Sequence, residues 1–342
     1  MNTLGLVLHP SRPVDDSIAT ILTCADERNE RVVVRQSDAG RVPAGVDVVS
    51  EARFVEEVDG LIALGGDGTM LGAMRLVIDR PVPVLGVNHG NLGFLTEVEP
   101  VRLPAALAQL ADGDFTIEPH PALRVDTDRA RLGAASGFND VVLGRSSRSG
   151  AVSLDLSVNG QQYGYYRADA VVVSTPTGST AYNYAAGGPV LSPSSGAQVI
   201  TPVAPMSGVS RPVVLGPADR VHLAVAADSA PVTVDVDGTP AIDLGHADWL
   251  TTTMRPEAGQ VVRLSEATHA SRSRVKLSLL DLPLRPDQLL ELIPPDVRRH
   301  AQIAAAHLQA AAEGAAQPPA GTAPPEPPAA PRNPNRPSFE EG

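Results

Sequence analysis

A glycine-rich turn between a predicted strand and a predicted helix constrains this chain more than any other feature. The turn reads Gly-Gly-Asp-Gly-Thr and spans residues 65–69. The apolar run 60–64 before it is typical of a buried strand, and apolar spacing over 71–78 predicts an amphipathic helix after it. Three glycines at this junction would allow positive φ angles and a close approach of the backbone to a ligand. The first amides of the helix are then a natural seat for phosphate.

Asp67, in the middle of this turn, is an odd neighbour for a phosphate because its carboxylate would repel the anion. The residue fits such a site if it holds a metal ion or takes a proton from an attacking hydroxyl group. Glycine and aspartate are also common in ordinary solvated turns. A lone glycine motif is a weak signal, so the rest of the chain has to decide between a phosphate site and a plain turn.

The first part of the chain alternates predicted strands with predicted helices, and the pattern changes near Pro119. Strands are predicted at 4–8, 31–35, 60–64 and 83–87, and helices at 14–29, 51–57 and 103–110. This order predicts an α/β domain with a parallel sheet covered by helices on both faces. Beyond Pro119 apolar and polar residues alternate, and Asn159-Gly160 predicts a type I′ hairpin turn. The second part is therefore predicted to be all-β.

We expect four segments in the 342 residues. An α/β domain spans 1–119, an all-β domain spans 120–265, a strand and helix at 266–313 return to the first domain, and a tail spans 314–342. From residue 318 onward, 9 of the 25 residues are proline and none is Val, Ile or Leu. Such a tail cannot bury enough apolar surface to offset its ordering entropy, so it is predicted to be disordered.

The composition excludes several classes of partner. A net charge of −12 argues against nucleic acid and anionic membranes, although it leaves room for a local site that binds a small anion. The single cysteine, Cys24, cannot form an internal disulfide. No run of 18 apolar residues and no basic-then-apolar N-terminus is present. We therefore expect a soluble, cytoplasmic protein.

Two further stretches carry polar groups at the ends of predicted strands. The loop 88–96, Asn-His-Gly-Asn-Leu-Gly-Phe-Leu-Thr, follows a predicted parallel strand. Open α/β sheets bind ligands at this edge. Asn139 and Asp140 precede another strand and supply acceptors suited to ribose hydroxyls. A loop and a turn with no ligand remain the alternatives for these two stretches.

Two longer stretches lie in the predicted all-β part. In 167–189 an apolar strand breaks into Pro-Thr-Gly-Ser-Thr-Ala-Tyr, with a helix expected to open at Ser179 or Thr180. Its hydroxyls and free amides suit a purine edge and phosphates, and Tyr182 could stack on a base or pack between domains. In 202–214 Arg211 could clamp a phosphate or cap a neighbouring loop.

These motifs, in this order over residues 4–265, resemble the NAD kinase family. The Gly-Gly-Asp-Gly-Thr turn is shared with diacylglycerol, sphingosine and phosphofructokinase relatives, but the 88–96 loop and the 175–189 stretch are much more specific. The resemblance implies that an N-terminal α/β domain binds the phosphate donor and a β-sandwich-like domain binds the dinucleotide. It implies transfer from ATP to the 2′-hydroxyl of the adenosine ribose of NAD, giving NADP. It also implies a divalent metal, Mg²⁺ carried by the nucleotide phosphates, and a homodimer or homotetramer.

The resemblance also implies roles for individual residues, with Asp67 as the general base. It assigns the ATP phosphates to Gly65, Gly66, Gly68, Thr69 and Asn88. It assigns NAD to Asp67, Gly68, Asn139, Asp140, Arg167, Asp169, Thr180, Ala181, Tyr182, Asn183, Ala185 and Ala204, and assigns no metal ligand directly. Four residues depart from the family pattern: Asp140 replaces Glu, Met206 replaces a frequent His, Ala170 replaces Gly, and Thr239 replaces Gln.

Two other functions compete with this interpretation. A lipid kinase would share the glycine turn, but the chain lacks a basic or apolar stretch suited to a membrane surface. A non-catalytic NAD(H)-binding regulator is the second alternative, suggested by Met206 and the other departures. The sequence leaves open whether polyphosphate replaces ATP and whether NADH is used as well as NAD.

Overall fold

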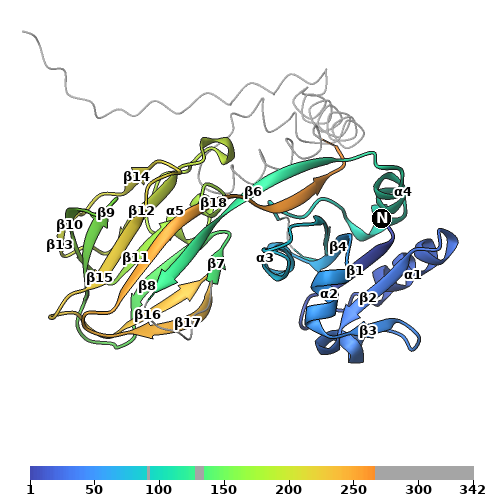
Figure 1. Ribbon diagram of the computed structural model, residues 1–342, viewed down its shortest axis with the longest axis horizontal. Coiled ribbons are helices and arrows are strands. Elements are labelled where there is room, and N and C mark those ends of the chain that lie inside the picture. Colours follow the sequence, from blue (N-terminus) through green and yellow to red (C-terminus); the bar gives the residue numbers. More distant parts are fainter. Residues whose placement is uncertain (91–92, 128–134, 266–342) are drawn as a thin grey trace, which may run out of the picture. The chain divides into compact units, whose positions relative to one another are not determined.

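The structure, a computed structural model, describes residues 1–90, 93–127 and 135–265 (Figure 1). Its first part is built on five parallel strands in the order β3-β2-β1-β4-β5. They are β1 (Thr3–Leu8), β2 (Arg31–Arg35), β3 (Asp47–Val49), β4 (Gly60–Gly65) and β5 (Pro83–Asn88). Leu8 pairs with Leu64 and Gly65 pairs with Asn88, so the carboxyl ends of β1, β4 and β5 lie together at one edge.

Four α-helices and two 3₁₀ helices lie between these strands or directly after them. A further 3₁₀ helix lies later in the chain. The α-helices are α1 (Asp15–Glu27), α2 (Glu51–Glu57), α3 (Asp67–Leu76) and α4 (Leu103–Asp112). The 3₁₀ helices are η1 (Gln36–Arg41), η2 (Pro100–Arg102) and, later in the chain, η4 (Pro193–Ser195). None of the helices in the described residues is long and apolar enough to span a membrane.

The parallel strands are apolar on both faces because each face packs against a pair of helices. Side chains of α1 and α4 share one buried cluster with Leu6 of β1. Side chains of α2 and α3, including Phe54 and Met70, share another with Val7. Successive residues of a strand point to opposite faces, so Leu6 and Val7 belong to different clusters. This arrangement confirms the predicted α/β part with a parallel sheet.

The second part is an antiparallel β-sandwich, as predicted. One layer is a six-stranded sheet in the order β14-β12-β11-β8-β16-β17. Its strands are β8 (Asp140–Arg145), β11 (Ala170–Ser174), β12 (Gln198–Val203), β14 (Val213–Leu215), β16 (Val232–Val236) and β17 (Thr239–Leu244). The other layer contains β9 (Val152–Val158), β10 (Gln161–Ala168), β13 (Ser207–Gly208) and β15 (Val221–Val225). Leucines and valines of both layers form one buried cluster.

Two long strands, β6 (Thr116–Thr127) and β18 (Trp249–Arg263), join the two parts and run side by side in Figure 1. β18 pairs with β15 of the sandwich and, near Gln260, with β5 of the parallel strands. The short strand β7 (Ala135–Gly137) pairs with β6. All these strands belong to a single twelve-stranded sheet. The domain boundary expected between residues 119 and 120 lies within β6.

The structure confirms one local prediction, the turn at 159–160, and contradicts another, the helix start after β11. Asn159 and Gly160 have φ angles of 53° and 80°, as a type I′ turn requires. After β11 the chain forms a 3₁₀ helix, η3 (Thr177–Thr180), and only then the short helix α5 (Tyr182–Ala185). The expected helix start at Ser179 or Thr180 is therefore wrong. Both hydroxyls bond to carbonyl oxygens three residues back, which competes with a regular helix start.

The predicted strand and helix within 266–313 and the predicted disordered tail at 314–342 lie outside the described residues.

Candidate active site

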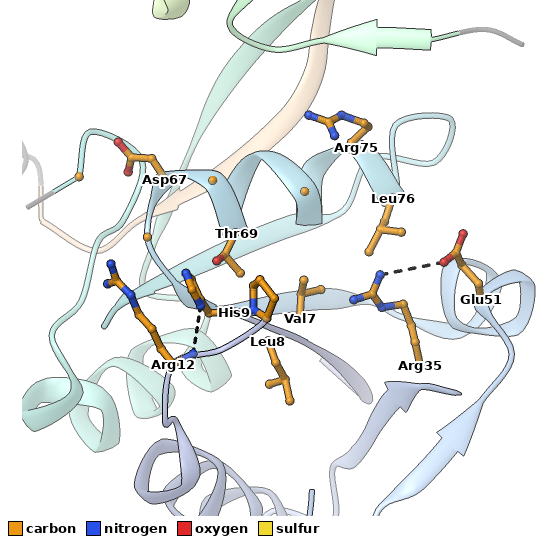
Figure 2. A pocket seen from close by; sticks show the side chains of 15 residues that line it. Val7, Leu8, His9, Arg12, Arg35, Glu51, Asp67, Thr69, Arg75 and Leu76 are labelled. Carbon is orange, nitrogen blue, oxygen red and sulfur yellow. Dashed lines mark hydrogen bonds and ion pairs between the residues drawn. The ribbon is translucent and has the colours of Figure 1, made fainter. Parts of the chain in front are cut away.

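A cavity of about 930 Å³ lies at the carboxyl edge of the parallel strands (Figure 2). Its walls come from the end of β1 and the loop after it, from the start of α2, and from one side of α3. The lining residues are Val7, Leu8, His9, Pro10, Arg12, Arg35, Glu51, Gly66, Asp67, Gly68, Thr69, Gly72, Arg75, Leu76 and Gly93. Four residues of the predicted phosphate turn, 66–69, therefore line one cavity. Gly65, the last residue of β4, immediately precedes them in the chain.

The glycines of this turn serve close approach and not an unusual backbone angle. Gly65, Gly66 and Gly68 are absent from the positive-φ residues, so the expectation of positive φ angles is wrong. A Cβ on Gly65 would lie 2.0 Å from the Thr69 Oγ1, so this glycine is needed for packing. At Gly66, Gly68 and Gly72 a Cβ would meet no atom within 4 Å. Because Gly68 and Gly72 are one turn apart and both line the cavity, α3 exposes bare backbone there.

The N-terminus of α3 is suited to an anion. Gly66 is the N-cap residue and offers no side chain to the first amides of the helix. The Thr69 amide donates to the Gly66 carbonyl oxygen at 3.0 Å, and the amides at the start of the helix carry the positive end of the helix dipole. The Thr69 hydroxyl is buried and has no hydrogen-bond partner among the described residues, so it is available to a ligand.

The carboxylate of Asp67 is held in place by the loop after β5. It accepts hydrogen bonds from the Phe94 amide at 2.8 Å and from the Leu95 amide at 3.0 Å. Gly93 is required for this approach, since a Cβ there would lie 2.0 Å from the Asp67 Oδ1. Figure 2 shows this carboxylate at the N-terminal end of α3, at one end of the cavity.

Arg12 and His9, which were not predicted from the sequence, lie opposite this end of α3, and Arg12 supplies a positive charge there. Arg12 donates to the His89 carbonyl oxygen at 2.6 Å and pairs with no carboxylate among the described residues. The His9 Nδ1 accepts from the Arg12 amide at 3.1 Å, and burial, Arg12 and Arg41 lower the pKa of His9. Both residues follow β1, whose end lies beside the end of β4. The sequence contains a signal that could have identified this loop. The loop follows a strand that pairs in parallel with β4, and Pro10 and Pro13 lie within it.

At the other end of the cavity the charged groups are paired. Arg35 lies 2.8 Å from Asp38 and 4.0 Å from Glu51, and Figure 2 shows the Arg35–Glu51 pair below Leu76. Arg75, on the last turn of α3, lies 2.7 Å from Asp237. Arg12, which forms no ion pair among the described residues, therefore lies at the end of the cavity that contains Asp67.

Asp237 fixes the turn that contains Asn139 and Asp140. Its carboxylate accepts from the amides of Phe138 at 3.0 Å, Asn139 at 2.7 Å and Asp140 at 3.2 Å. Asp237 has a φ of 47° and its side chain is fully buried. The Asp237 carboxylate therefore holds three successive backbone amides at the start of β8.

Asp140 is buried beside two other carboxylates. It is 5% exposed, and burial together with Asp237 and Asp235 raises the pKa of its side chain to about 7. Near neutral pH this carboxyl group is therefore divided between its charged and neutral forms. A proton, or a hydrogen bond donated by a ligand hydroxyl, would stabilise this buried carboxyl group.

The hydroxyl-rich turn after β11 packs directly against Asn139. The Thr175 hydroxyl donates to the Phe138 carbonyl oxygen at 2.6 Å, and the Thr175 amide donates to the Asn139 carbonyl oxygen at 2.9 Å. A Cβ on Gly178 would lie 2.0 Å from that Asn139 oxygen. The structure thus brings together two stretches that the sequence analysis assigned to the dinucleotide.

A second cavity, of about 270 Å³, opens beside this turn. Thr177 and Thr180 form one wall, and the opposite side comes from the loop that holds Asp67, together with β6 and the end of β18. Its lining is Phe94, Leu95, Glu118, His120, Pro176, Thr177, Thr180, Val190, Leu191, Ser192, Pro193 and Arg263. Only Thr180 of these residues was assigned to NAD from the sequence.

The remaining candidates have other partners or face solvent. Asn183 is fully buried, and its carboxamide bonds to Ser179, Pro189 and Thr201, so its side chain holds the turn. Arg167 pairs with Asp228, Asp169 pairs with Arg145, and the Asn88 side chain accepts from the Gly90 amide. Tyr182 is 43% exposed, and Ala181, Ala185, Ala204 and Arg211 are at least partly exposed.

The described residues contain no group of three or more His, Cys, Asp or Glu side chains arranged to hold a metal ion.

Comparisons with known proteins agree with this geometry. Residues 14–115 match the family model of the ATP-NAD kinase N-terminal domain, and residues 138–264 match that of the C-terminal domain. The NAD kinase of Moorella thermoacetica is 34% identical over 279 residues, which cover 81% of this chain and 89% of the relative.

Two solved structures share the fold. The yeast NADH kinase complexed with NADH has a TM-score of 0.73 at 21% identity, covering 84% of this chain and 90% of its own. The NAD kinase from Archaeoglobus fulgidus in complex with ATP has a TM-score of 0.62 at 19% identity, covering 80% and 98%. Both family models and the Moorella relative show that this chain belongs to the ATP-NAD kinase family.

Proposed function

We propose that this chain transfers the γ-phosphoryl group of ATP to the 2′-hydroxyl of the adenosine ribose of NAD, giving NADP. The observation that carries the proposal is the Asp67 carboxylate, held by two backbone amides at the anion-binding end of α3. It lies in the large cavity and beside the loop that lines the second cavity. A base at this position has one cavity available for a phosphate donor and another for part of the acceptor.

The donor phosphates would lie along the bare backbone of Gly66, Gly68 and Gly72, with the Arg12 guanidinium facing them. The amides at the start of α3 and this guanidinium would stabilise charge on the phosphate oxygens. A divalent metal, for which we propose Mg²⁺, would neutralise charge on these oxygens when bound, and Asp67, a carboxylate in the lining of the same cavity, would help to hold it. Phosphoryl transfer depends mainly on such positioning and electrostatics.

The acceptor would lie against the turn that Asp237 holds. Asn139 and Asp140 supply acceptors for ribose hydroxyls, and Thr177 and Thr180 line a cavity that suits part of the dinucleotide. A ribose hydroxyl is a poor nucleophile at neutral pH. Asp67 would take its proton as the oxygen bonds to the γ-phosphorus and the bond to ADP breaks.

Assembly and location are further proposals. We infer a homodimer or homotetramer, which light scattering of the full chain would test. The cytoplasmic location expected from the sequence stays a prediction, as does the choice between ATP and polyphosphate and between NAD and NADH.

The test is a coupled assay of NADP formation with each donor and each acceptor in turn. Asp67→Asn should fold and bind NAD but lose about 10²–10⁴-fold in kcat, the usual weight of general acid–base catalysis. Asp79→Asn is the matched control, since Asp79 is 90% exposed on the surface. Turnover of Asp67→Asn near that of the control would remove Asp67 as the base.

Two further measurements, of NAD binding and of phosphate transfer to a lipid alcohol, separate the two alternative functions. NAD binding without turnover in the unmodified chain would indicate a regulator, and phosphorylation of a lipid alcohol would indicate a lipid kinase. The family matches favour neither alternative.

A further inference from the structure

Arg263, the last residue of β18, is a buried arginine whose contacts converge on the loop that holds Asp67. It is 5% exposed. Its Nη2 donates to the Phe94 carbonyl oxygen at 3.2 Å, and its Nη1 donates to the Leu95 carbonyl oxygen, also at 3.2 Å. A guanidinium presents several N–H groups in one rigid plane, which lets a single side chain bind two successive carbonyl groups.

Two carboxylates fix the position of this guanidinium. Its Nε lies 2.5 Å from Glu118 on β6, and its Nη1 lies 3.3 Å from Glu97. Glu97 in turn accepts from the amides of Leu264 and Ser265, at 3.1 and 3.3 Å. The end of β18 is therefore bonded to the loop twice, once through Arg263 and once through Glu97. Arg263 has little freedom to move as a result.

The peptide group between Phe94 and Leu95 lies between Arg263 and Asp67. Its carbonyl oxygen accepts from Arg263, and its N–H donates to the Asp67 Oδ1 at 3.0 Å. The negative end of the peptide dipole thus faces a cation and the positive end faces a carboxylate. Arg263 and Asp67 each polarise the peptide group. Each of them thereby strengthens the hydrogen bond that the peptide group makes with the other residue.

We propose that Arg263 is a positioning residue for phosphoryl transfer, which acts by holding the Phe94–Leu95 peptide so that Asp67 keeps its orientation. The proposal rests on the assignment of Asp67 as general base under Proposed function. Arg263 does not contact the reacting atoms in this role. Its loss would let the peptide turn, and the carboxylate would then no longer be aimed at the ribose hydroxyl.

The test is a double-mutant cycle that combines Arg263→Lys with Asp67→Asn. Lysine keeps the positive charge but cannot bind both carbonyl groups in one plane. In the otherwise unmodified enzyme, Arg263→Lys should lower kcat about 10- to 100-fold, the scale expected for a misplaced catalytic group. KM for NAD and for ATP should stay within about twofold, because an interaction that matters only in the transition state changes kcat alone.

In the Asp67→Asn background the same substitution should cause no further loss of kcat, because there is no base left to orient. Arg255→Lys is the matched control on the same strand. Arg255 pairs with the exposed Asp79 at 3.0 Å, and its substitution should leave kcat unchanged in both backgrounds. Hydrogen exchange of the peptide covering 93–97 should become faster in Arg263→Lys only.

Several outcomes would overturn the proposal. An unchanged kcat in folded Arg263→Lys, an equal loss in both backgrounds, or a rise in KM for NAD in place of a fall in kcat would each do so. If Arg263→Lys does not fold, the cycle is run with Glu118→Gln, which keeps the arginine but loosens it, and an unchanged kcat then overturns the proposal. Full turnover in Asp67→Asn alone would instead show that the base assignment is wrong, and this inference would fall with it.

Discussion

Arg75 on α3 and Asp237 in the turn between β16 and β17 form an ion pair with a separation of 2.7 Å, although 162 residues separate them in the chain. The same carboxylate binds the amides of Asn139 and Asp140. One buried carboxylate therefore connects the helix that lines the large cavity with the turn proposed to bind NAD.

Arg75→Met should loosen that connection. A hydrogen bond to a charged group is worth about 1.5–3 kcal/mol, so we expect a lower melting temperature and a several-fold rise in KM for NAD, with a smaller change for ATP. Arg53→Met is the control, since its pair with Glu57 is on the surface of α2. If KM for NAD stays at the unmodified value, the ion pair contributes to stability only.

Gly93→Ala should impair catalysis more than it impairs folding. The added Cβ would lie 2.0 Å from the Asp67 Oδ1 and 2.9 Å from the Thr96 Oγ1, so the carboxylate has to move. We expect kcat to fall at least about tenfold, because small displacements of a catalytic group are costly. Gly40→Ala is the control, since a Cβ there meets no atom within 4 Å. Equal kcat values for the two variants would contradict this account.

The carboxyl group of Asp140 should make both stability and NAD binding depend on pH. Its pKa rises from 3.8 to about 7 on folding, so between these values the folded protein keeps a proton that the unfolded chain has lost. Stability therefore falls as pH rises through this window, by an amount on the order of a few kcal/mol. Asp140→Asn removes this cost and should raise the melting temperature at pH 8 more than at pH 5.

Binding supplies a second readout for the same residue. If the charged Asp140 accepts a hydroxyl of NAD, KM for NAD should fall as pH rises through about 7, the pKa of this group. The dependence should be absent in Asp140→Asn and unchanged in Asp155→Asn, which alters an exposed carboxylate. A pH profile shared by all three proteins would assign the titration to another group.

Glu118 should stabilise the protein in the opposite pH range. Burial alone would raise the pKa of Glu118, but the nearby His120 ring and the Arg263 guanidinium together lower it to about 2. Stability from this charge is complete above the unfolded value of 4.5 and is lost as pH falls from 4.5 towards 2. Glu118→Gln should therefore lower the melting temperature at pH 7, and the difference should shrink at pH 3. Glu56→Gln, on the surface of α2, should show no such convergence.

Local patterns were sufficient to predict much of the fold. The predicted helix 51–57 has the same bounds as α2, because Ser50 caps it and apolar residues mark its buried side. The start of α5 was predicted too early because hydroxyl side chains bond to the backbone there. The continuous sheet through β18 could not be predicted, since its pairing with β5 joins residues more than 170 positions apart.

The candidate site was predictable where one short segment carries the chemistry. Asp67 and the glycines around it share a single strand–turn–helix unit, so their neighbourhood follows from local structure. Arg12, in the loop after β1, and Arg263, at the end of β18, reach the site from separate elements, and only tertiary packing brings them there. Each is an ordinary arginine in its own sequence context, which gave no signal to single it out.

The bare side of α3 has a consequence for how this protein can be made more heat-resistant. Glycine in a helix interior costs about 1 kcal/mol relative to alanine, and this ten-residue helix contains both Gly68 and Gly72. A selection for thermal tolerance alone would favour Gly72→Ala, whose methyl group meets no atom within 4 Å. That methyl group would project into the large cavity, where we place the donor phosphates. At position 72, therefore, heat resistance favours alanine, whereas use of the phosphate donor favours glycine.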